Sequence, residues 1–282
     1  WRPAAVFLTG GYVAAPVALA ARLGGVPVTV YAPDIEPGLA LKSVSGLAAR
    51  ILVTAEESRR YYPARAPVTV VGYPVRAELA SAARSGAVAG EVLDGNDQTV
   101  LIFGGSRGAR SINRALQACL AQLLALAQVI HISGELDWAE TKAAAEALPP
   151  EGRARYHAFP YLHNAEMGAA FAHADLVVAR AGASTLGELP AFGLPGVLVP
   201  YPHAWRYQRV NADYLVSRGA AVRLNDQNLQ RDLLPLLRSL LADPARLETM
   251  RQAARRLARP DAARQIAREI RATTQRTKTW SA

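Results

Sequence analysis

Short apolar segments with the composition of buried β-strands alternate with helical segments along the whole chain. Helical patterns lie between these strands, and uniformly apolar strands that alternate with helices are typical of parallel sheets covered on both faces. The alternation therefore predicts an α/β fold with doubly wound parallel sheets. The strands are expected at residues 4–8, 27–31, 50–54, 67–71, 99–103, 128–132, 154–158, 174–179, 196–199 and 220–224, and the main helices at 109–126, 137–147, 183–193, 206–218 and 226–241.

The alternation is interrupted once, at residues 80–98, where Ser, Gly and Asn give the composition of a linker. With 282 residues the chain is long enough for two domains. We expect a partial N-terminal domain at 1–79, a C-terminal ligand-binding domain at 99–258, and a helix with a basic tail at 259–282. Ligands of open α/β sheets bind beyond the carboxyl ends of the strands, so the loops after strands and the cleft between domains are the expected site.

The chain begins with Trp1 rather than Met and enters its first strand almost at once. We therefore expect a fragment that lacks an N-terminal segment. Residues 4–21 are nearly uncharged, but they combine a strand at 6–8, a Gly10-Gly11 turn and an alanine-rich helix. This mixture favours strand, loop and helix over a membrane span or a signal peptide.

The chain carries a net charge of +9, most of it near the C-terminus. Residues 231–282 contain twelve Lys and Arg against five Asp and Glu. A solvated helical face and an anionic partner surface both explain this excess, and the lack of interleaved aromatic residues favours lipid over nucleic acid. The single cysteine, Cys119, is expected in the core of a helix and fits a reducing compartment. No spacing of Cys and His resembles a metal site.

Residues 99–114 read as a buried strand, a glycine-rich turn and the first turn of a helix. Gly104, Gly105 and Gly108 let the backbone approach a ligand, and the helix start offers unpaired N–H groups with a positive dipole end. Such a turn suits a phosphate, although many α/β proteins use the same turn for packing alone.

A second strand runs into a turn of small residues at 180–188. Its N–H groups suit a pyrophosphate, and the hydroxyls of Ser184 and Thr185 add donors. Glu188 is placed to accept hydrogen bonds from a ribose diol. The alternative for Glu188 is a capping or surface carboxylate.

Two further loops carry polar residues after strands. Gln208 follows a proline-bounded loop that begins at Pro200, and it can bind a sugar hydroxyl or simply be an exposed residue at a helix start. Arg76 follows the turn at 72–75, where it can meet a diphosphate or form a salt bridge to the other domain.

Together these loops resemble the MurG family of glycosyltransferases. The resemblance rests on five motifs in register, at residues 10–13, 72–76, 104–109, 180–188 and 200–211, and covers essentially the whole chain. It implies a GT-B fold, in which two Rossmann-like domains face each other across a cleft, with the N-terminal domain incomplete here. It also implies inverting, metal-independent transfer of N-acetylglucosamine from UDP-N-acetylglucosamine to lipid I, which makes lipid II for peptidoglycan. The enzyme would sit peripherally on the cytoplasmic face of the plasma membrane and would need no cofactor.

The resemblance also assigns residues by position. Gly10, Gly11 and Tyr12 match a glycine loop on the acceptor side. The general base matches a loop upstream of Trp1, so this chain is expected to bind donor but to turn over poorly. The residues expected at the donor are Asp34, Arg76, Gly105, Ser106, Tyr161, Leu162, Ala183, Ser184, Thr185, Leu186, Gly187, Glu188 and Gln208.

Two departures from the family pattern affect this assignment. Residues 31–34 read Tyr-Ala-Pro-Asp where family members commonly have His-Glu-Gln-Asn, so Asp34 offers only acceptors at a sugar contact. Tyr207 replaces the first glutamine of a Gln-Gln pair. Three alternatives stay open: a related UDP-sugar lipid glycosyltransferase, a UDP-sugar 2-epimerase, and a non-catalytic nucleotide-sugar-binding fragment that needs a partner chain.

Overall fold

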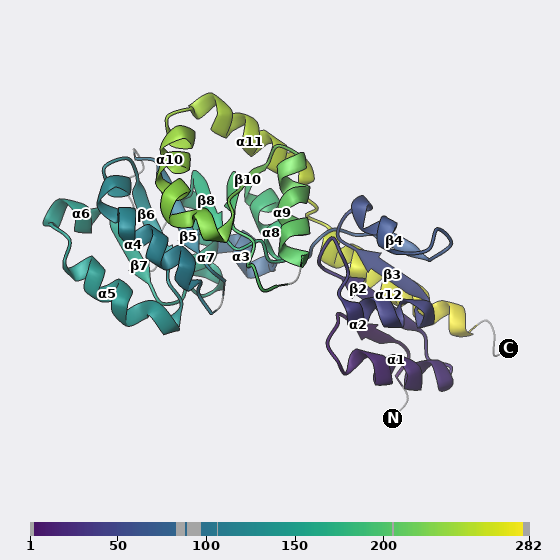
Figure 1. The fold of residues 1–282 in the computed structure, drawn as a ribbon. Helices are drawn as coiled ribbons and strands as arrows, with labels where there is room; N and C mark the ends of the chain where they lie inside the picture. The colour runs from purple at the N-terminus through teal and green to yellow at the C-terminus, as the bar shows by residue number, and fades with distance from the viewer. Residues whose placement is uncertain (1–2, 83–87, 89–96, 106, 205, 279–282) are drawn as a thin grey trace. The chain divides into compact units, whose positions relative to one another are not determined.

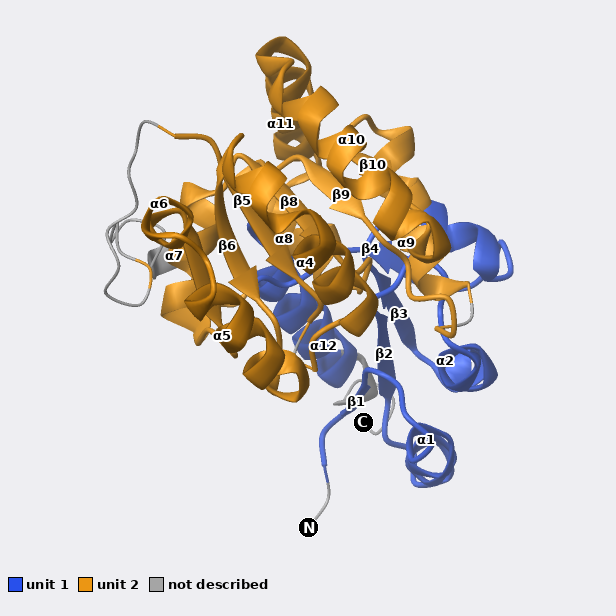
Figure 2. Cartoon of the chain, turned by 60° about the vertical axis from the view of Figure 1, so that its left-hand side comes forward, with its two compact units in different colours: residues 1–75, 259–282 blue, residues 76–258 orange. Residues whose placement is uncertain are grey.

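The computed structural model describes residues 3–82, 88, 97–105, 107–204 and 206–278, and it divides into two compact units (Figures 1 and 2). The first unit comprises residues 1–75 and 259–282, and the second comprises residues 76–258. Each unit has its own sheet, and every strand pairing in both sheets is parallel. The predicted α/β fold with parallel sheets is therefore confirmed.

The sheet of the first unit has four strands in the order of the sequence. They are β1 (Val6–Leu8), β2 (Val28–Ala32), β3 (Arg50–Val53) and β4 (Val68–Val70). The helices of this unit are α1 (Ala14–Leu23), α2 (Leu39–Val44) and α12 (Ala262–Lys278), with 3₁₀ turns at Ser45–Leu47 and Glu56–Tyr61.

The two faces of this sheet are covered by different parts of the chain. Successive side chains of a strand point to opposite faces. Val28 and Val30 of β2 pack in a core with residues of α1 and α2, whereas Tyr31 packs with Ile266 of α12. Residues from both ends of the sequence thus build one unit.

Residues 259–282 had been expected as a separate helix and tail after the second domain. The structure instead groups them with the first unit, where α12 packs on the sheet (Figure 2). Arg50 of β3 also lies 3.5 Å from Glu269 of α12. The sequence alone offered no indication of this return, because the apolar stripe of a helix does not specify which sheet it covers.

The second unit contains a six-stranded sheet in the order β10-β9-β8-β5-β6-β7. The first strand of this unit, β5, lies in the middle of the sheet. The next strands, β6 and β7, follow on one side of it, and β8 then lies on the other side. The order therefore reverses between β5 and β8, and this reversal is where open α/β sheets bind ligands. The strands are β5 (Thr99–Phe103), β6 (Gln128–Ile132), β7 (Tyr156–Phe159), β8 (Leu176–Ala179), β9 (Gly196–Leu198) and β10 (Ala221–Arg223).

Helices connect these strands and lie against the sheet (Figure 1). The largest core cluster joins α4 and α10 to the central strands, and Cys119 lies in it as predicted. The helices are α3 (Ala77–Ala82), α4 (Arg110–Leu124), α5 (Trp138–Glu146), α6 (Pro150–Ala154), α7 (Asn164–His173), α8 (Thr185–Phe192), α9 (Tyr207–Ser217), α10 (Leu229–Leu241) and α11 (Pro244–Leu257), with 3₁₀ turns at Glu135–Asp137 and Asp226–Asn228.

All ten expected strands form, with ends within two residues of the prediction. The expected linker differs, because helix α3 continues to Ala82 and Val88 is buried. Residues 83–87 and 89–96 of that linker lie outside the described residues. None of the helices in the described part of the chain is both long and apolar enough to cross a membrane.

Candidate functional site

The two small-residue turns predicted to hold phosphate lie side by side at the sheet reversal. Strands β5 and β8 pair directly, from Val100 opposite Leu176 to Phe103 opposite Ala179. The turns that follow these strands lead into α4 and α8, so two helix N-termini with positive dipole ends lie at one edge of the sheet.

A cavity of about 870 Å³ lies over these turns, within the range of small-molecule sites. Its described lining comes from five segments of the second unit: the turns after β5 and β8, the loop after β9, and the 3₁₀ turns after β6 and β10. Its described lining includes Gly104, Gly105, Arg107, Arg110, Ser111, Asp137, Arg180, Gly182, Ser184, Thr185, Tyr201, His203, Gln208 and Asp226.

The three glycines of the first turn have different roles. A Cβ on Gly104 would lie 2.2 Å from the Ala109 nitrogen, and one on Gly108 would lie 2.1 Å from the Ser133 carbonyl oxygen. These two glycines permit close packing within the protein. Only Gly105, at φ +90°, has open space where a Cβ would be. Of the three positions predicted to face a ligand, Gly105 alone is left open for that purpose.

The second turn begins with Arg180, a cation whose side chain is only 11% exposed. Its guanidinium donates to the Asp226 carboxylate at 2.5 Å and to the Ser111 hydroxyl at 2.7 Å. It also lies over the ring of Tyr201, 5.3 Å from the centroid. Arg180 therefore joins the turns after β5, β8 and β10 into one wall of the cavity.

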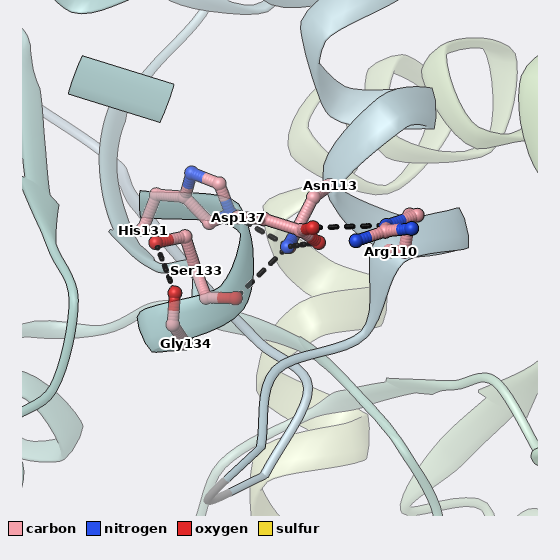
Figure 3. Close-up of polar contacts among 6 residues, drawn as sticks. All are labelled: Arg110, Asn113, His131, Ser133, Gly134 and Asp137. Atoms are coloured by element: carbon pink, nitrogen blue, oxygen red, sulfur yellow. Dashed lines mark hydrogen bonds and ion pairs between the residues drawn. The ribbon is translucent and has the colours of Figure 1, made fainter. Parts of the chain in front are cut away.

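A polar network next to the first turn joins exposed Arg110 to the buried residues Asn113 and Asp137 (Figure 3). Arg110 donates to the Asp137 carboxylate at 3.0 Å, and the other carboxylate oxygen accepts from the Asn113 amide at 2.8 Å. The same amide donates to the Ser133 carbonyl at 2.9 Å. Both α4 side chains in Figure 3 thus converge on Asp137.

His131 completes this network inside the core, where it is fully buried. Because the Asn113 amide nitrogen already faces two acceptors, its oxygen faces His131 Nε2 at 3.0 Å, and Nε2 must donate. His131 Nδ1 then accepts from the Tyr156 hydroxyl at 2.7 Å. Burial lowers the pKa of His131 from 6.5 to about 4, against the opposing effect of the Asp137 charge, so the ring is neutral at pH 7.

A second polar cluster joins Arg76 to Glu188. The Arg76 guanidinium donates to the Asn164 side chain at 2.5 Å and lies 3.4 Å from the Glu188 carboxylate. Glu188 is buried, so the surface-carboxylate alternative is wrong for it. Both partners of Arg76 belong to the same unit as Arg76 itself, and these contacts are not a salt bridge to the other domain.

Gln208 is held by its own loop rather than left exposed. Its amide oxygen accepts from the Tyr201 backbone N–H at 2.8 Å, and the residue lines the cavity. The amide nitrogen remains as the hydrogen-bond donor of this side chain. In the neighbouring turn, Thr185 donates to the Gly182 carbonyl at 2.7 Å and so closes the start of α8.

Comparison with known proteins decides the family. Residues 99–266 match the glycosyltransferase family 28 C-terminal domain. A relative from Roseiflexus sp. (strain RS-1) is 44% identical over 302 residues, which cover 94% of this chain and 68% of the relative. Its name is UDP-N-acetylglucosamine--N-acetylmuramyl-(pentapeptide) pyrophosphoryl-undecaprenol N-acetylglucosamine transferase. The chain belongs to this family.

Solved structures agree with the family. The crystal structure of Acinetobacter baumannii MurG is 28% identical with a TM-score of 0.75, covering 95% of this chain and 74% of that one. A putative UDP-N-acetylglucosamine 2-epimerase from Listeria monocytogenes is 14% identical with a TM-score of 0.67, covering 94% of this chain and 73% of that one. At 14% identity, the similarity to the Listeria monocytogenes protein shows a shared fold and nothing more. The predicted membership of the MurG family and the GT-B fold are therefore confirmed, and the epimerase alternative gains no support.

The structure brings part of the predicted donor site to the cavity. Gly105, Ser184, Thr185 and Gln208 line it. Ser106, also expected at the donor, lies outside the described residues. Ala183, Leu186 and Gly187 belong to the same turn and helix start but do not appear in the described lining, and Arg76 and Glu188 form their own cluster.

Tyr161 and Leu162, two of the residues expected at the donor, lie just before α7. Leu162 is buried, whereas Tyr161 is 44% exposed with its ring edge-on to His163. The His163 backbone N–H donates to the Glu166 carboxylate at 2.8 Å. This hydrogen bond caps helix α7, whose first residue is Asn164. Tyr161 thus offers an exposed aromatic side chain two residues before His163, but its contact with the donor stays a prediction.

The remaining predicted residues lie in the first unit. Gly10 and Gly11 have φ values of +123° and +88°, and Tyr12 is 98% exposed. Asp34 is half-buried. Tyr31, at the first departure from the family pattern, is buried and donates to the Gly72 carbonyl at 3.1 Å.

Sequence reasoning missed Asp137, Asn113 and Asp226. Asn113 carried a usable signal, because it falls on the apolar side of α4 between Ile112 and Leu116. A polar residue at a buried helix position needs a hydrogen-bond partner, so it marks a network before the partner is known. Asp137 and Asp226 lie in short 3₁₀ turns whose pairing depends on the sheet order.

Proposed function

We propose that this chain is a hexosyltransferase that moves N-acetylglucosamine from UDP-N-acetylglucosamine to lipid I, the pyrophosphoryl-undecaprenol-linked N-acetylmuramyl-pentapeptide, and so makes lipid II. The observation that carries the proposal is the 44% identity to a relative of that name over 94% of this chain. The cavity at the sheet reversal supports it, because it combines two helix N-termini with several cations, as a nucleoside diphosphate requires.

In this proposal the donor diphosphate lies against Gly105 and the N-terminus of α8. The backbone N–H groups there and the hydroxyl of Ser184 would bind its oxygens. Glu188 keeps one carboxylate oxygen on Arg76 and offers the other to the ribose diol. Gln208 would donate from its amide nitrogen to an oxygen of the sugar, since its oxygen is already engaged.

The same groups would assist the departure of UDP. As the acceptor hydroxyl attacks the anomeric carbon, the bond to the leaving phosphate breaks and negative charge grows on that phosphate. Fixed dipoles and cations stabilise such charge without reorganising. We assign this role to the protein's own N–H groups and arginines, and we propose that no cofactor or metal takes part.

Peripheral binding at the cytoplasmic face of the plasma membrane belongs to the proposal as well, since lipid I carries an undecaprenyl chain. Exposed apolar side chains at α1 support it. Tyr12, Val13 and Leu23 are 98%, 71% and 81% exposed. Such side chains suit the boundary between lipid headgroups and acyl chains, and the basic α12 would add attraction to anionic lipids.

Calorimetry and a transfer assay test the proposal. The chain is expected to bind UDP-N-acetylglucosamine more tightly than its C4 epimer UDP-N-acetylgalactosamine, and to release UDP only slowly when a soluble lipid I analogue is added. Failure to bind the donor would overturn the proposal. Formation of UDP-N-acetylmannosamine from the donor alone would replace it with the epimerase reaction.

A further inference from the structure

The described lining of the cavity contains three arginines and two aspartates. Arg110 is paired with Asp137 at 3.0 Å, and Arg180 is paired with Asp226 at 2.5 Å. Each pair is close to neutral as a whole, so neither arginine presents its full charge to a ligand. The remaining cation of this lining is Arg107.

Arg107 differs from the other two arginines in its contacts. It makes no ion pair and no side-chain hydrogen bond with any residue in the described part of the chain, and it is exposed. A cation in a cavity that also holds two helix N-termini makes the net field there positive. That field suits an anion with more than one negative charge.

The residue that follows Arg107 has defined contacts with the rest of the unit. The Gly108 N–H donates to the Gly105 carbonyl at 2.9 Å. Gly108 packs against Ser133, whose carbonyl is in turn held by Asn113 at 2.9 Å (Figure 3). The network thus packs against Gly108, the residue next to Arg107, while the Arg107 guanidinium makes no ion pair or side-chain hydrogen bond within the described part of the chain.

We propose that Arg107 is a further donor-binding residue, whose guanidinium binds the diphosphate of the nucleotide sugar. The inference rests on the proposed function and adds to it a specific side-chain contact. A guanidinium presents a planar set of donors that matches two phosphate oxygens at once, and such charge-assisted bonds are about twice as strong as neutral ones. Arg107 lines the same cavity as Gly105, the glycine of this turn that has open space where a Cβ would be.

The test measures binding of UDP and of uridine to the wild-type chain and to Arg107→Gln. UDP and uridine differ only in the diphosphate, so their affinity ratio isolates its contribution. Arg107→Gln is expected to lower UDP affinity roughly tenfold or more and to leave uridine binding unchanged. Arg107→Lys should recover part of the loss, because it restores the charge but not the paired donors.

Arg238→Gln is the matched control, since it removes the same charge from an exposed position at the end of α10 that is absent from the described cavity lining. It should leave both affinities unchanged. Equal UDP affinity in Arg107→Gln and wild type would overturn the inference alone. A wild-type chain that binds neither UDP nor UDP-N-acetylglucosamine would overturn the proposed function and the inference together. Thermal unfolding of each variant confirms that it is folded.

Discussion

The guanidinium of Arg76 lies 3.4 Å from the carboxylate of Glu188, 112 residues further along the chain. The two residues were predicted separately, one for a diphosphate and one for a ribose. The structure shows that they interact directly and share a cluster with Asn164. The Glu188 side chain is 9% exposed and that of Arg76 is 53% exposed, so the carboxylate is the buried partner and the cation faces solvent.

Arg76→Gln and Glu188→Gln are expected to show coupled effects. Arg76→Gln leaves the buried Glu188 carboxylate without its cation and should cost about 1 kcal/mol of unfolding free energy, a value kept low because water screens the half-exposed arginine. Both variants should weaken UDP-N-acetylglucosamine binding roughly tenfold. The double variant should lose less than the sum of the two, as residues in direct contact do. Additive losses, measured by calorimetry, would show that the pair acts as two independent contacts.

Gln208 should tolerate little change in its amide. Gln208→Glu keeps the size of the side chain but replaces its only ligand-facing donor with an acceptor, near a site for an anion. Donor affinity is expected to fall more in Gln208→Glu than in Gln208→Ala, because the glutamate adds repulsion to the lost hydrogen bond. UDP-N-acetylglucosamine titrations of both variants measure this order. A larger loss of affinity in Gln208→Ala than in Gln208→Glu would mean that the amide nitrogen does not contact UDP-N-acetylglucosamine.

Substitutions at two glycines of the first turn should have different effects, one mainly on the free energy of unfolding and the other mainly on UDP binding. Gly108→Ala introduces a Cβ 2.1 Å from the Ser133 oxygen at a φ of +74°, and should cost about 2 kcal/mol or more of unfolding free energy. Gly105→Ala meets open space, so it should cost only about 1 kcal/mol from its positive φ, while weakening UDP binding. Urea unfolding and calorimetry check the two effects. If Gly105→Ala left UDP binding intact, the diphosphate would not approach this backbone.

Protonation of His131 in mild acid should lower the free energy of unfolding. Its folded pKa of about 4 lies below its unfolded value of 6.5, so the unfolded chain binds the proton more readily. The stability from this group is complete above pH 6.5 and is lost as the pH falls toward 4. Between pH 7 and pH 5 the loss should be about 2 kcal/mol.

Urea unfolding at both pH values measures this loss, with His131→Gln as the test and the exposed His203→Gln as the control. His131→Gln should be less stable than wild type at pH 7 but less sensitive to acid, because it removes the titrating ring. His203→Gln should keep the wild-type pH dependence. Equal pH dependence in His131→Gln and wild type would mean that another group causes the acid sensitivity.

The two small-residue turns could be predicted from sequence because their cause is local. A buried strand, a run of small residues and a helix start fix the backbone of residues 99–114 and 180–188 whatever surrounds them. The strand positions followed for the same reason, since alternation of apolar segments reports parallel sheets directly.

Pairings between distant segments depended on the sheet order. Arg180 meets Asp226, and Asn113 meets Asp137, only because β5, β6, β8, β9 and β10 lie in the order that the structure has. The same holds for α12, whose apolar stripe fits a sheet but does not state which one. The sequence by itself determined where strands run into small-residue turns at helix starts. The tertiary structure decided that Arg110 and Arg180 are paired with carboxylates and that Arg107 has no such pair within the described part of the chain, because charge pairing depends on distances between segments that only the folded chain sets.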